Sequence, residues 1–324
     1  MTLITAGYFY NVQVCSVNKD IDSPHSPHST QEKMKNLLVL TDFSSHAKHA
    51  AEYAYAIAKK IDADIILCNA VIVPAEMPQA GLVVWPMEES SVLEEASLGE
   101  LEKLKEHLKK TDLSHDKKPQ IGTVNQSGYL QDEAQGLIAD RLIDFVVMGT
   151  HESGFGGFLL GNHTRNMIES LTVPLLLISS KVRIAPFKNI YFASDLSDPH
   201  GDRAFLKELI PLASAFKAEI FVAHISTPEN LASDISEKTK QMVIDFSSDL
   251  GYPGIHFIRV NEDKAIAGLD KLMSGKPMDL LVMVHREKSF LGRLLKGSMT
   301  EKLAKDLDFP MLIFKANPQA EHIA

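Results

Sequence analysis

The feature that most constrains this chain is an internal repeat. A stretch that opens with "KNLLVLTDFSS" at Lys35 returns as "KNIYFASDLSD" at Lys188, with an apolar run, an Asp and a Ser in the same order. The ends of the two halves also match, since "IDFVVMGTHE" is repeated as "MDLLVMVHRE" and "VPLLLIS" as "FPMLIFK". Repeats of this length are whole domains, because the units of a solenoid are much shorter. The chain therefore contains two copies of one domain.

Within each copy, short apolar runs alternate with amphipathic stretches. The runs are continuously apolar, which is typical of strands that are covered on both faces. Alternating strands and helices predict a parallel, doubly wound sheet with right-handed crossovers, so the fold class is α/β with two tandem five-stranded domains. The expected strands are residues 36–41, 64–70, 119–123, 144–148 and 174–178 in the first copy, and residues 188–193, 219–225, 254–259, 279–284 and 310–314 in the second.

The expected domains are residues 34–181 and 182–316, with an N-terminal arm at 1–33 and a tail at 317–324. The arm contains "NKDIDSPHSPHSTQEK", which is polar and rich in Pro and Ser and therefore predicts a loose or disordered segment. His25 and His28 lie in this stretch without an acid or Cys to complete a metal site, so a solvated tail is favoured. Met34 directly precedes the first strand and is a candidate start of the protein.

Composition excludes several functional classes. The chain of 324 residues has a net charge of −9 and no long basic run, which argues against nonspecific binding to nucleic acid or to an anionic membrane. No apolar run approaches the length of a membrane span. Cys15 and Cys68 are the only cysteines, so there is no disulfide framework and no zinc set. A cytoplasmic protein is expected.

Candidate binding residues follow the predicted strand ends. In a doubly wound sheet, ligands bind at the carboxyl ends of the strands, where the winding reverses. Asp42, Gly149 and their counterparts Asp195 and Val284 all follow such ends and should gather on one rim of each domain. One interpretation of "TDFSS" is that Ser44 or Ser45 caps the next helix; in the second copy Asp198 would cap and Pro199 would take the first turn. The alternative, compatible with the first, is that Asp42 accepts a hydrogen bond from a ribose hydroxyl or an adenine amine.

A glycine-rich loop, "GTHESGFGGFLLGNHT", follows the fourth strand of the first copy. Gly149 would let the backbone approach a ligand closely. A helix opening at "GNHT" would present unpaired N–H groups to an anion, with Asn162 as its cap and Thr164 adding a hydroxyl. The loop lacks the Walker pattern, and it is not a dinucleotide fingerprint because it follows the fourth strand instead of the first.

Together these residues resemble the universal stress proteins of the tandem, two-domain type. The resemblance rests on "VLTDFS", "AKKIDADIILCNAV", "DFVVMGTH" and "GNHTRNMIESLTVPLLLIS", and it covers nearly all of residues 35–315. It implies binding of ATP or a related nucleotide, with magnesium, in the first copy. The nucleotide-binding residues that it implies are Thr41, Asp42, Ala70, Met148, Gly149, His151, Gly161, Asn162, His163 and Thr164.

Both copies depart from the family's loop pattern of Gly, two residues, Gly, nine residues and Gly-Ser or Gly-Thr. The first copy has Glu152 at the second glycine position and reaches Gly161-Asn162 one residue early. A carboxylate there costs on the order of 1–4 kcal/mol of repulsion with a triphosphate, which magnesium would offset. The second copy has Val284 and Glu287 in place of both leading glycines, so its site is expected to be degenerate.

The second loop, "HREKSFLGRLLKGS", has two interpretations. It fits a solvated amphipathic loop, in which Ser298 and Glu301 form a capping box, and this interpretation is favoured. The alternative is a surface that docks an anion or a partner.

The sequence favours a regulatory or binding module of the stress response over an enzyme, because no Gly-x-Ser-x-Gly elbow or Ser-His-Asp order is present. The resemblance also implies that the domains pair through their last strands, related by a pseudo-two-fold axis, so that one chain mimics a dimer; a homodimer is the other assembly considered. Two alternative functions stay open. One is a weak nucleotide hydrolase or phosphotransfer protein, and the other is a protein-interaction scaffold that binds no nucleotide.

Overall fold

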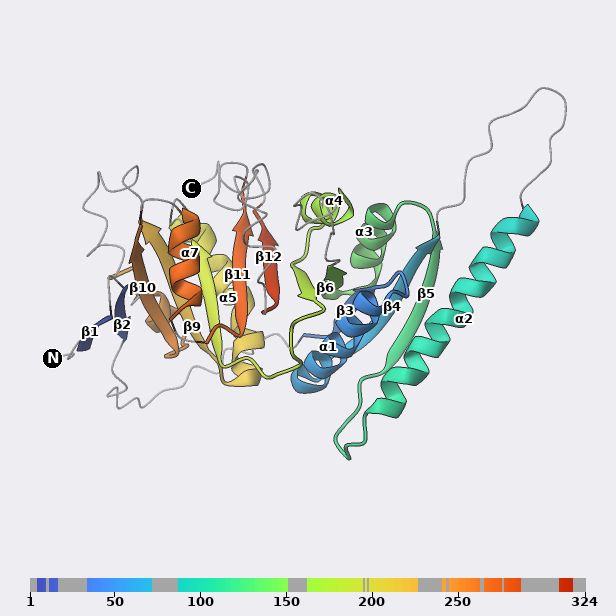
Figure 1. The fold of residues 1–324 in the computed structure, drawn as a ribbon, viewed down its shortest axis with the longest axis horizontal. Helices are drawn as coiled ribbons and strands as arrows, with labels where there is room; N and C mark the ends of the chain where they lie inside the picture. Colours follow the sequence, from blue (N-terminus) through green and yellow to red (C-terminus); the bar gives the residue numbers. More distant parts are fainter. Residues whose placement is uncertain are drawn as a thin grey trace, which may run out of the picture. The chain divides into compact units, whose positions relative to one another are not determined.

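The structure of the protein is a computed structural model (Figure 1). The structure describes residues 5–9, 12–16, 34–71, 87–150, 162–194, 196, 198–226, 241–242, 245–262, 265–275, 277–286 and 309–316. The chain forms two compact units. The first unit holds the described residues between 34 and 184, and the second holds those from 185 onward together with the N-terminal strands.

The first unit is built on five parallel strands. They are β3 (Asn36–Leu40), β4 (Asp64–Val71), β5 (Ile121–Ser127), β6 (Ile143–Thr150) and β7 (Leu175–Ser179). Their order is β7-β6-β3-β4-β5, and every neighbouring pair is parallel. The direction of winding therefore reverses between β3 and β6. Each strand predicted for the first copy is present, with ends that differ by at most a few residues.

Helices cover the sheet of the first unit. They are α1 (Ser45–Ile61), α2 (Met87–Thr111), α3 (Leu130–Arg141) and α4 (Asn162–Ser170). The helix α1 packs on β3, β6 and β7, whereas α2 packs on β4 and β5 and touches α1. The buried face of α1 is rich in alanine, namely Ala47, Ala50, Ala51, Ala54 and Ala58. Because these side chains are short, the backbone of α1 lies close to the sheet.

The second unit repeats this plan. Its strands are β8 (Asn189–Ser194), β9 (Glu219–Ser226), β10 (Ile255–Asn261), β11 (Leu280–His285) and β12 (Met311–Lys315), in the parallel order β10-β9-β8-β11-β12. Its helices include α5 (Pro199–Phe216) and α7 (Ala265–Met273). The predicted start of α5 is confirmed, because the Asp198 side chain accepts from the Gly201 N–H at 2.9 Å and Pro199 begins the helix.

One hydrogen-bond pattern explains why the two halves open and close with the same letters. A carboxylate oxygen of Asp144, in β6, accepts from the N–H groups of Lys35 and Asn36 at 2.5 and 2.8 Å. In the second unit Asp279, just before β11, does the same for residues 188–189, at 2.9 and 2.8 Å. The Lys-Asn pair and the Asp recur in both halves because their hydrogen bonds align the two central strands of each unit, β3 with β6 and β8 with β11.

The N-terminal segment differs from expectation. Residues Thr5–Phe9 (β1) and Val12–Ser16 (β2) form an antiparallel hairpin, and β2 pairs antiparallel with β10. The expectation of a loose arm is therefore wrong for these two strands. The edge of β10 offers unpaired backbone groups that a short strand satisfies by pairing, so no strong apolar face is needed. The polar stretch with His25 and His28 lies outside the described residues.

Candidate functional site

The carboxyl ends of three adjacent strands form a rim in the first unit. Thr41 and Asp42 follow β3, Ala70 is the penultimate residue of β4, and Met148 and Gly149 lie near the end of β6. Leu40 of β3 is in register with Met148. The structure thus brings five of the predicted site residues to one rim, and all but Ala70 lie where the winding reverses, which is where such sheets bind ligands.

Thr41 is held in place by hydrogen bonds to the adjacent strand β4. Its N–H donates to the Cys68 carbonyl at 2.9 Å, and its carbonyl accepts from the Asn69 side-chain amide at 2.6 Å. Its hydroxyl oxygen accepts from the Phe43 N–H at 3.0 Å, and the residue is only 5% exposed. Both the N–H and the carbonyl of Thr41 are therefore fixed by β4.

Asp42 lies at the surface of the rim. A carboxylate oxygen of Asp42 accepts from the Ser44 N–H at 3.0 Å, and the Ser44 hydroxyl accepts from the Ala47 N–H at 3.2 Å. Ser44 is thus the cap of α1, as one of the two predicted choices. Between them Phe43 has a φ of 64°, a left-handed conformation that is uncommon for a bulky residue and occurs often at functional sites. The Asp42 side chain is exposed at the surface of the rim.

Gly149 has a structural explanation. A Cβ at this position would lie 2.7 Å from the His46 carbonyl oxygen and 2.8 Å from its carbon. The first turn of α1 therefore occupies the space that the missing side chain leaves. This packing gives the glycine a structural role, and the approach of a ligand to its backbone stays a prediction.

The helix predicted at "GNHT" is present as α4, with Asn162 as its first residue instead of the residue before it. Helix ends vary by a residue or two between definitions, so this difference is small. Thr164 is 5% exposed on this helix. His151, Glu152 and Gly161, and the side chains of Asn162 and His163, lie outside the described residues.

The rim of the second unit is closed by an ion pair. Arg286 follows β11 three residues after Met283, as His151 follows Met148, and these two Met residues occupy equivalent register positions. The Arg286 guanidinium donates to the Asp202 carboxylate at 2.7 Å and lies 3.6 Å from the Asp198 carboxylate. The Arg286 side chain is 9% exposed and that of Asp202 is fully buried.

Residues around this ion pair form a hydrogen bond to it and pack against it. The Ser194 hydroxyl, at the end of β8, donates to the second carboxylate oxygen of Asp202. The Phe205 ring lies 6.0 Å from the guanidinium carbon of Arg286. A Cβ at Gly201 would lie 2.0 Å from an Asp198 oxygen and 3.3 Å from the guanidinium. Val284 is buried within β11, and Asp195, Glu287 and Ser298 lie outside the described residues.

A family model for the "Universal stress protein family" matches the chain twice, over residues 33–179 and 186–315. The chain belongs to the universal stress protein family. The two matches, one after the other, make it a tandem member and confirm the resemblance drawn from the sequence.

Solved structures of similar fold span both domains. A universal stress protein from Archaeoglobus fulgidus has a TM-score of 0.64 at 17% identity, with 87% of this chain and 98% of that chain covered. A protein of unknown function from Pseudomonas aeruginosa has a TM-score of 0.56 at 14% identity, with 90% of this chain and 96% of that chain covered. Comparison with curated proteins gave no significant match.

These likenesses show the α/β fold of the family and leave the ligand open. Within the described residues, none of the helices is long and apolar enough to cross a bilayer.

Proposed function

We propose that the first unit of this universal stress protein binds ATP or a related nucleotide, together with magnesium, and that the chain acts as a regulatory binding module. The observation that carries the proposal is the convergence of Thr41, Asp42, Met148 and Gly149 at the reversal between β3 and β6. An exposed carboxylate at that point suits a ribose hydroxyl or an adenine amine, both of which are donors. The opening of α4, reached by the loop after β6, would lie toward the phosphates.

The second unit supports a contrasting proposal for its own rim. There the buried Arg286–Asp202 pair and the Asp198 carboxylate stand at the strand ends. A nucleotide in this position would have to displace a desolvated ion pair, which costs several kcal/mol. We therefore assign nucleotide binding to the first unit alone.

Two other functions are tested by the same experiment. A weak hydrolase or phosphotransfer protein would release phosphate from bound ATP, and a scaffold would bind no nucleotide. Bound nucleotide is measured by denaturing the purified protein and separating the supernatant by chromatography. ATP affinity is then measured by titration calorimetry with and without magnesium.

The deciding variant is Asp42→Ala. Asp42 is exposed, so its removal leaves the core intact, and ATP affinity should fall about tenfold or more because a hydrogen bond to a charged acceptor is lost. Asp140→Ala is the control, because Asp140 is an exposed acid on α3 with no hydrogen bond or ion pair among the described residues. Equal affinities for the two variants would contradict the proposed site. No binding by the wild type would contradict the proposal and favour the scaffold. Phosphate release that is lost in Asp42→Ala would favour the hydrolase.

Pairing of the two domains, and any homodimer, stay predictions of the family resemblance. Sedimentation at several protein concentrations tests the homodimer, since a chain whose domains pair only internally keeps the mass of one chain.

A further inference from the structure

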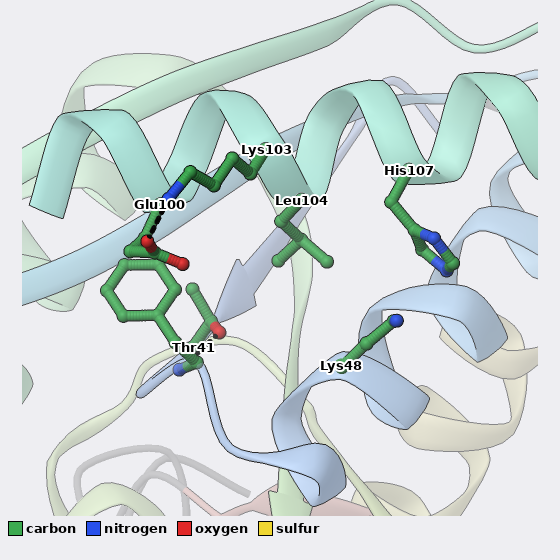
Figure 2. A pocket seen from close by; sticks show the side chains of 7 residues that line it. Thr41, Lys48, Glu100, Lys103, Leu104 and His107 are labelled. Atoms are coloured by element: carbon green, nitrogen blue, oxygen red, sulfur yellow. Dashed lines mark hydrogen bonds and ion pairs between the residues drawn. The ribbon is translucent and has the colours of Figure 1, made fainter.

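A pocket of about 170 Å³ lies beside Thr41, on the side of the rim that faces α1 and α2 (Figure 2). It is lined by Thr41, Phe43, Lys48, Glu100, Lys103, Leu104 and His107. A cavity of about 150 Å³ is enough to bind benzene, so this space admits a molecule the size of one six-membered ring. None of the α2 residues in this lining was among the site residues predicted from the sequence.

Two of the three basic side chains that line the pocket have an acidic partner, and the third, Lys48, has none among the described residues. Lys103 pairs with Glu100 at 2.6 Å, and the His107 ring lies 2.6 Å from the Glu52 carboxylate. Lys48 has no ion pair or side-chain hydrogen bond among the described residues, and Figure 2 shows it extending from α1 toward α2.

The position of Lys48 makes this mismatch informative. Lys48 lies in the first turn of α1, and that turn contains no acidic residue. The two acids that flank Lys48 in the sequence are engaged elsewhere, since Asp42 accepts from the Ser44 N–H and Glu52 pairs with His107. The amino end of a helix carries partial positive charge, so a lysine there is electrostatically unfavourable unless a negative group is near. A ligand with an acidic group would supply that negative charge.

Thr41 supplies a second, buried contact at the same pocket. The residue is 5% exposed, and its hydroxyl oxygen already accepts from the Phe43 N–H. The hydroxyl proton has no acceptor within the part of the chain that the structure describes. A buried hydroxyl normally donates as well as accepts, so an oxygen of a ligand in the pocket would complete its hydrogen bonding. Leu104, which is 7% exposed, adds an apolar wall.

We propose that this pocket binds a ring-sized small molecule bearing one phosphate or carboxylate, with the acid at Lys48, an oxygen at the Thr41 hydroxyl and the ring against Leu104. The pocket goes beyond the nucleotide site proposed above, because its other lining residues come from α1, α2 and Phe43 and not from β6 or the glycine loop.

Phenyl phosphate is the probe, because it joins one ring to one phosphate and lacks both base and ribose. Its affinity is measured by calorimetry, and its location by NMR of the Thr41 and Leu104 methyl groups. In Lys48→Met, which keeps a side chain of similar length, the affinity should fall about tenfold or more. Lys60→Met is the matched control, since Lys60 is an exposed lysine near the other end of α1 without an ion pair among the described residues, and its affinity should equal that of the wild type.

Two further measurements separate this pocket from the rim. Asp42→Ala should weaken ATP and leave phenyl phosphate unchanged, whereas Lys48→Met should do the reverse. Phenol and inorganic phosphate should each bind more weakly than phenyl phosphate, because each makes only half of the contacts. The proposal is overturned if phenyl phosphate does not bind at about 10 mM, a concentration that detects even very weak sites, or if Lys48→Met binds it as well as Lys60→Met does.

Discussion

The two rims of the protein stand at the same place in the repeated fold and are built in opposite ways. In the first unit the strand ends carry an exposed carboxylate, Asp42, and the close contact between Gly149 and α1. In the second unit a valine replaces the glycine, and Arg286 closes over a fully buried Asp202. The first rim thus presents a carboxylate to solvent, while the second is filled by its own side chains.

The scaffold beneath the two rims has hardly changed. Both units tie their central strands with an aspartate, and both end the first helix with a left-handed residue, Asp62 at φ 57° and Lys217 at φ 54°. Both also place a bulky left-handed residue after the first strand, Phe43 at 64° and Leu196 at 55°. The contrast teaches that a duplicated domain can keep its strand alignment while a few residues at the strand ends change how each rim is filled.

The largest expected effect comes from breaking the ion pair of the second rim. Asp202→Ala removes the closer carboxylate of the buried Arg286, leaves Asp198 at 3.6 Å, and should destabilise the second unit by about 3 kcal/mol or more. Asp249→Ala is the control, because its ion pair with Arg203 spans 3.3 Å between exposed side chains and should contribute less than about 1 kcal/mol. Hydrogen exchange of β8 and β11 reports the stability of this unit. Equal effects of the two variants would show that the rim is not a closed, desolvated site.

The next prediction concerns a substitution that gives the rim of the first unit the residue found in the second. Gly149→Val introduces the residue found at position 284, and its Cβ would meet the His46 backbone at 2.7 Å. Backbone atoms can move aside only at a large cost in free energy, so we expect the free energy of unfolding to fall by about 3 kcal/mol. Gly99→Ala is the control: Gly99 is exposed on α2 with no atom within 4 Å of an added Cβ, so this change should stabilise by about 0.5–1 kcal/mol. A Gly149→Val protein that melts like the wild type would show that α1 does not need the glycine.

A smaller effect tests the shared scaffold. Asp144→Ala and Asp279→Ala each remove the acceptor of two backbone N–H groups, so each should destabilise its own unit by about 2 kcal/mol. Urea unfolding followed by strand-specific hydrogen exchange measures both. If one aspartate matters far more than the other, the two units are less alike than their hydrogen bonds indicate.

Much of the fold could be predicted because it depends on local patterns. Continuous apolar runs predicted all ten parallel strands, and the pair Asp198-Pro199 predicted the start of α5. The Arg286–Asp202 pair could not be predicted, because its residues are separated by 84 positions and meet only when β11 and α5 pack together.

The N-terminal hairpin and the α2 lining of the pocket escaped prediction for related reasons. The strand β2 pairs with β10, which lies more than two hundred residues away in the chain, and the five residues of "VQVCS" are too short a run to indicate a strand alone. Lys48 and His107 gain significance only from the contact between α1 and α2, which no short pattern encodes. Within the site, five predicted residues reached the rim, since each follows or ends a predictable strand.

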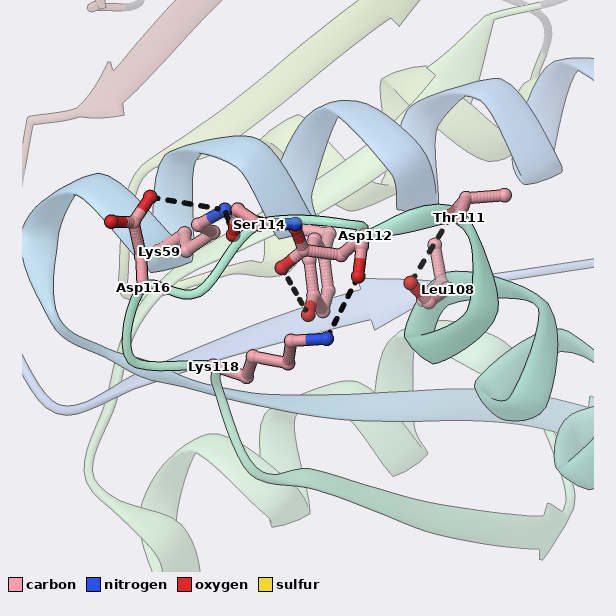
Figure 3. A network of polar contacts seen from close by, with 8 residues as sticks. Lys59, Leu108, Thr111, Asp112, Ser114, Asp116 and Lys118 are labelled. Atoms are coloured by element: carbon pink, nitrogen blue, oxygen red, sulfur yellow. Dashed lines mark hydrogen bonds and ion pairs between the residues drawn. The ribbon is translucent and has the colours of Figure 1, made fainter.

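The smallest expected effect concerns a polar cluster in the first unit that joins the end of α1 to the loop after α2 (Figure 3). The Asp112 carboxylate accepts from the Tyr55 hydroxyl at 3.1 Å, the Lys59 ammonium at 3.0 Å and the Ser114 N–H at 3.0 Å. Burial raises the pKa of Asp112, but hydrogen bonds from Ser114, Lys59 and Tyr55 outweigh it and hold the pKa well below its usual range. Burial and Asp112 in turn raise the pKa of Tyr55 to about 12, so the phenol remains a donor at neutral pH.

Asp112→Asn should therefore lower the stability of the first unit by about 1 kcal/mol at pH 7. A lowered pKa in the folded state stabilises only above the unfolded pKa of about 3.9, and this contribution is lost as pH falls toward the folded value. The difference between wild type and variant should then be constant from about pH 7 to pH 5 and shrink steadily below about pH 4. Thermal unfolding across this range measures it. Exposed Asp116, 3.6 Å from the same lysine, is the control, and Asp116→Asn should leave the unfolding curve unchanged at every pH. A difference for Asp112→Asn that grows as the solution becomes more acidic would mean that the carboxylate is destabilised by burial instead of stabilised by its three donors.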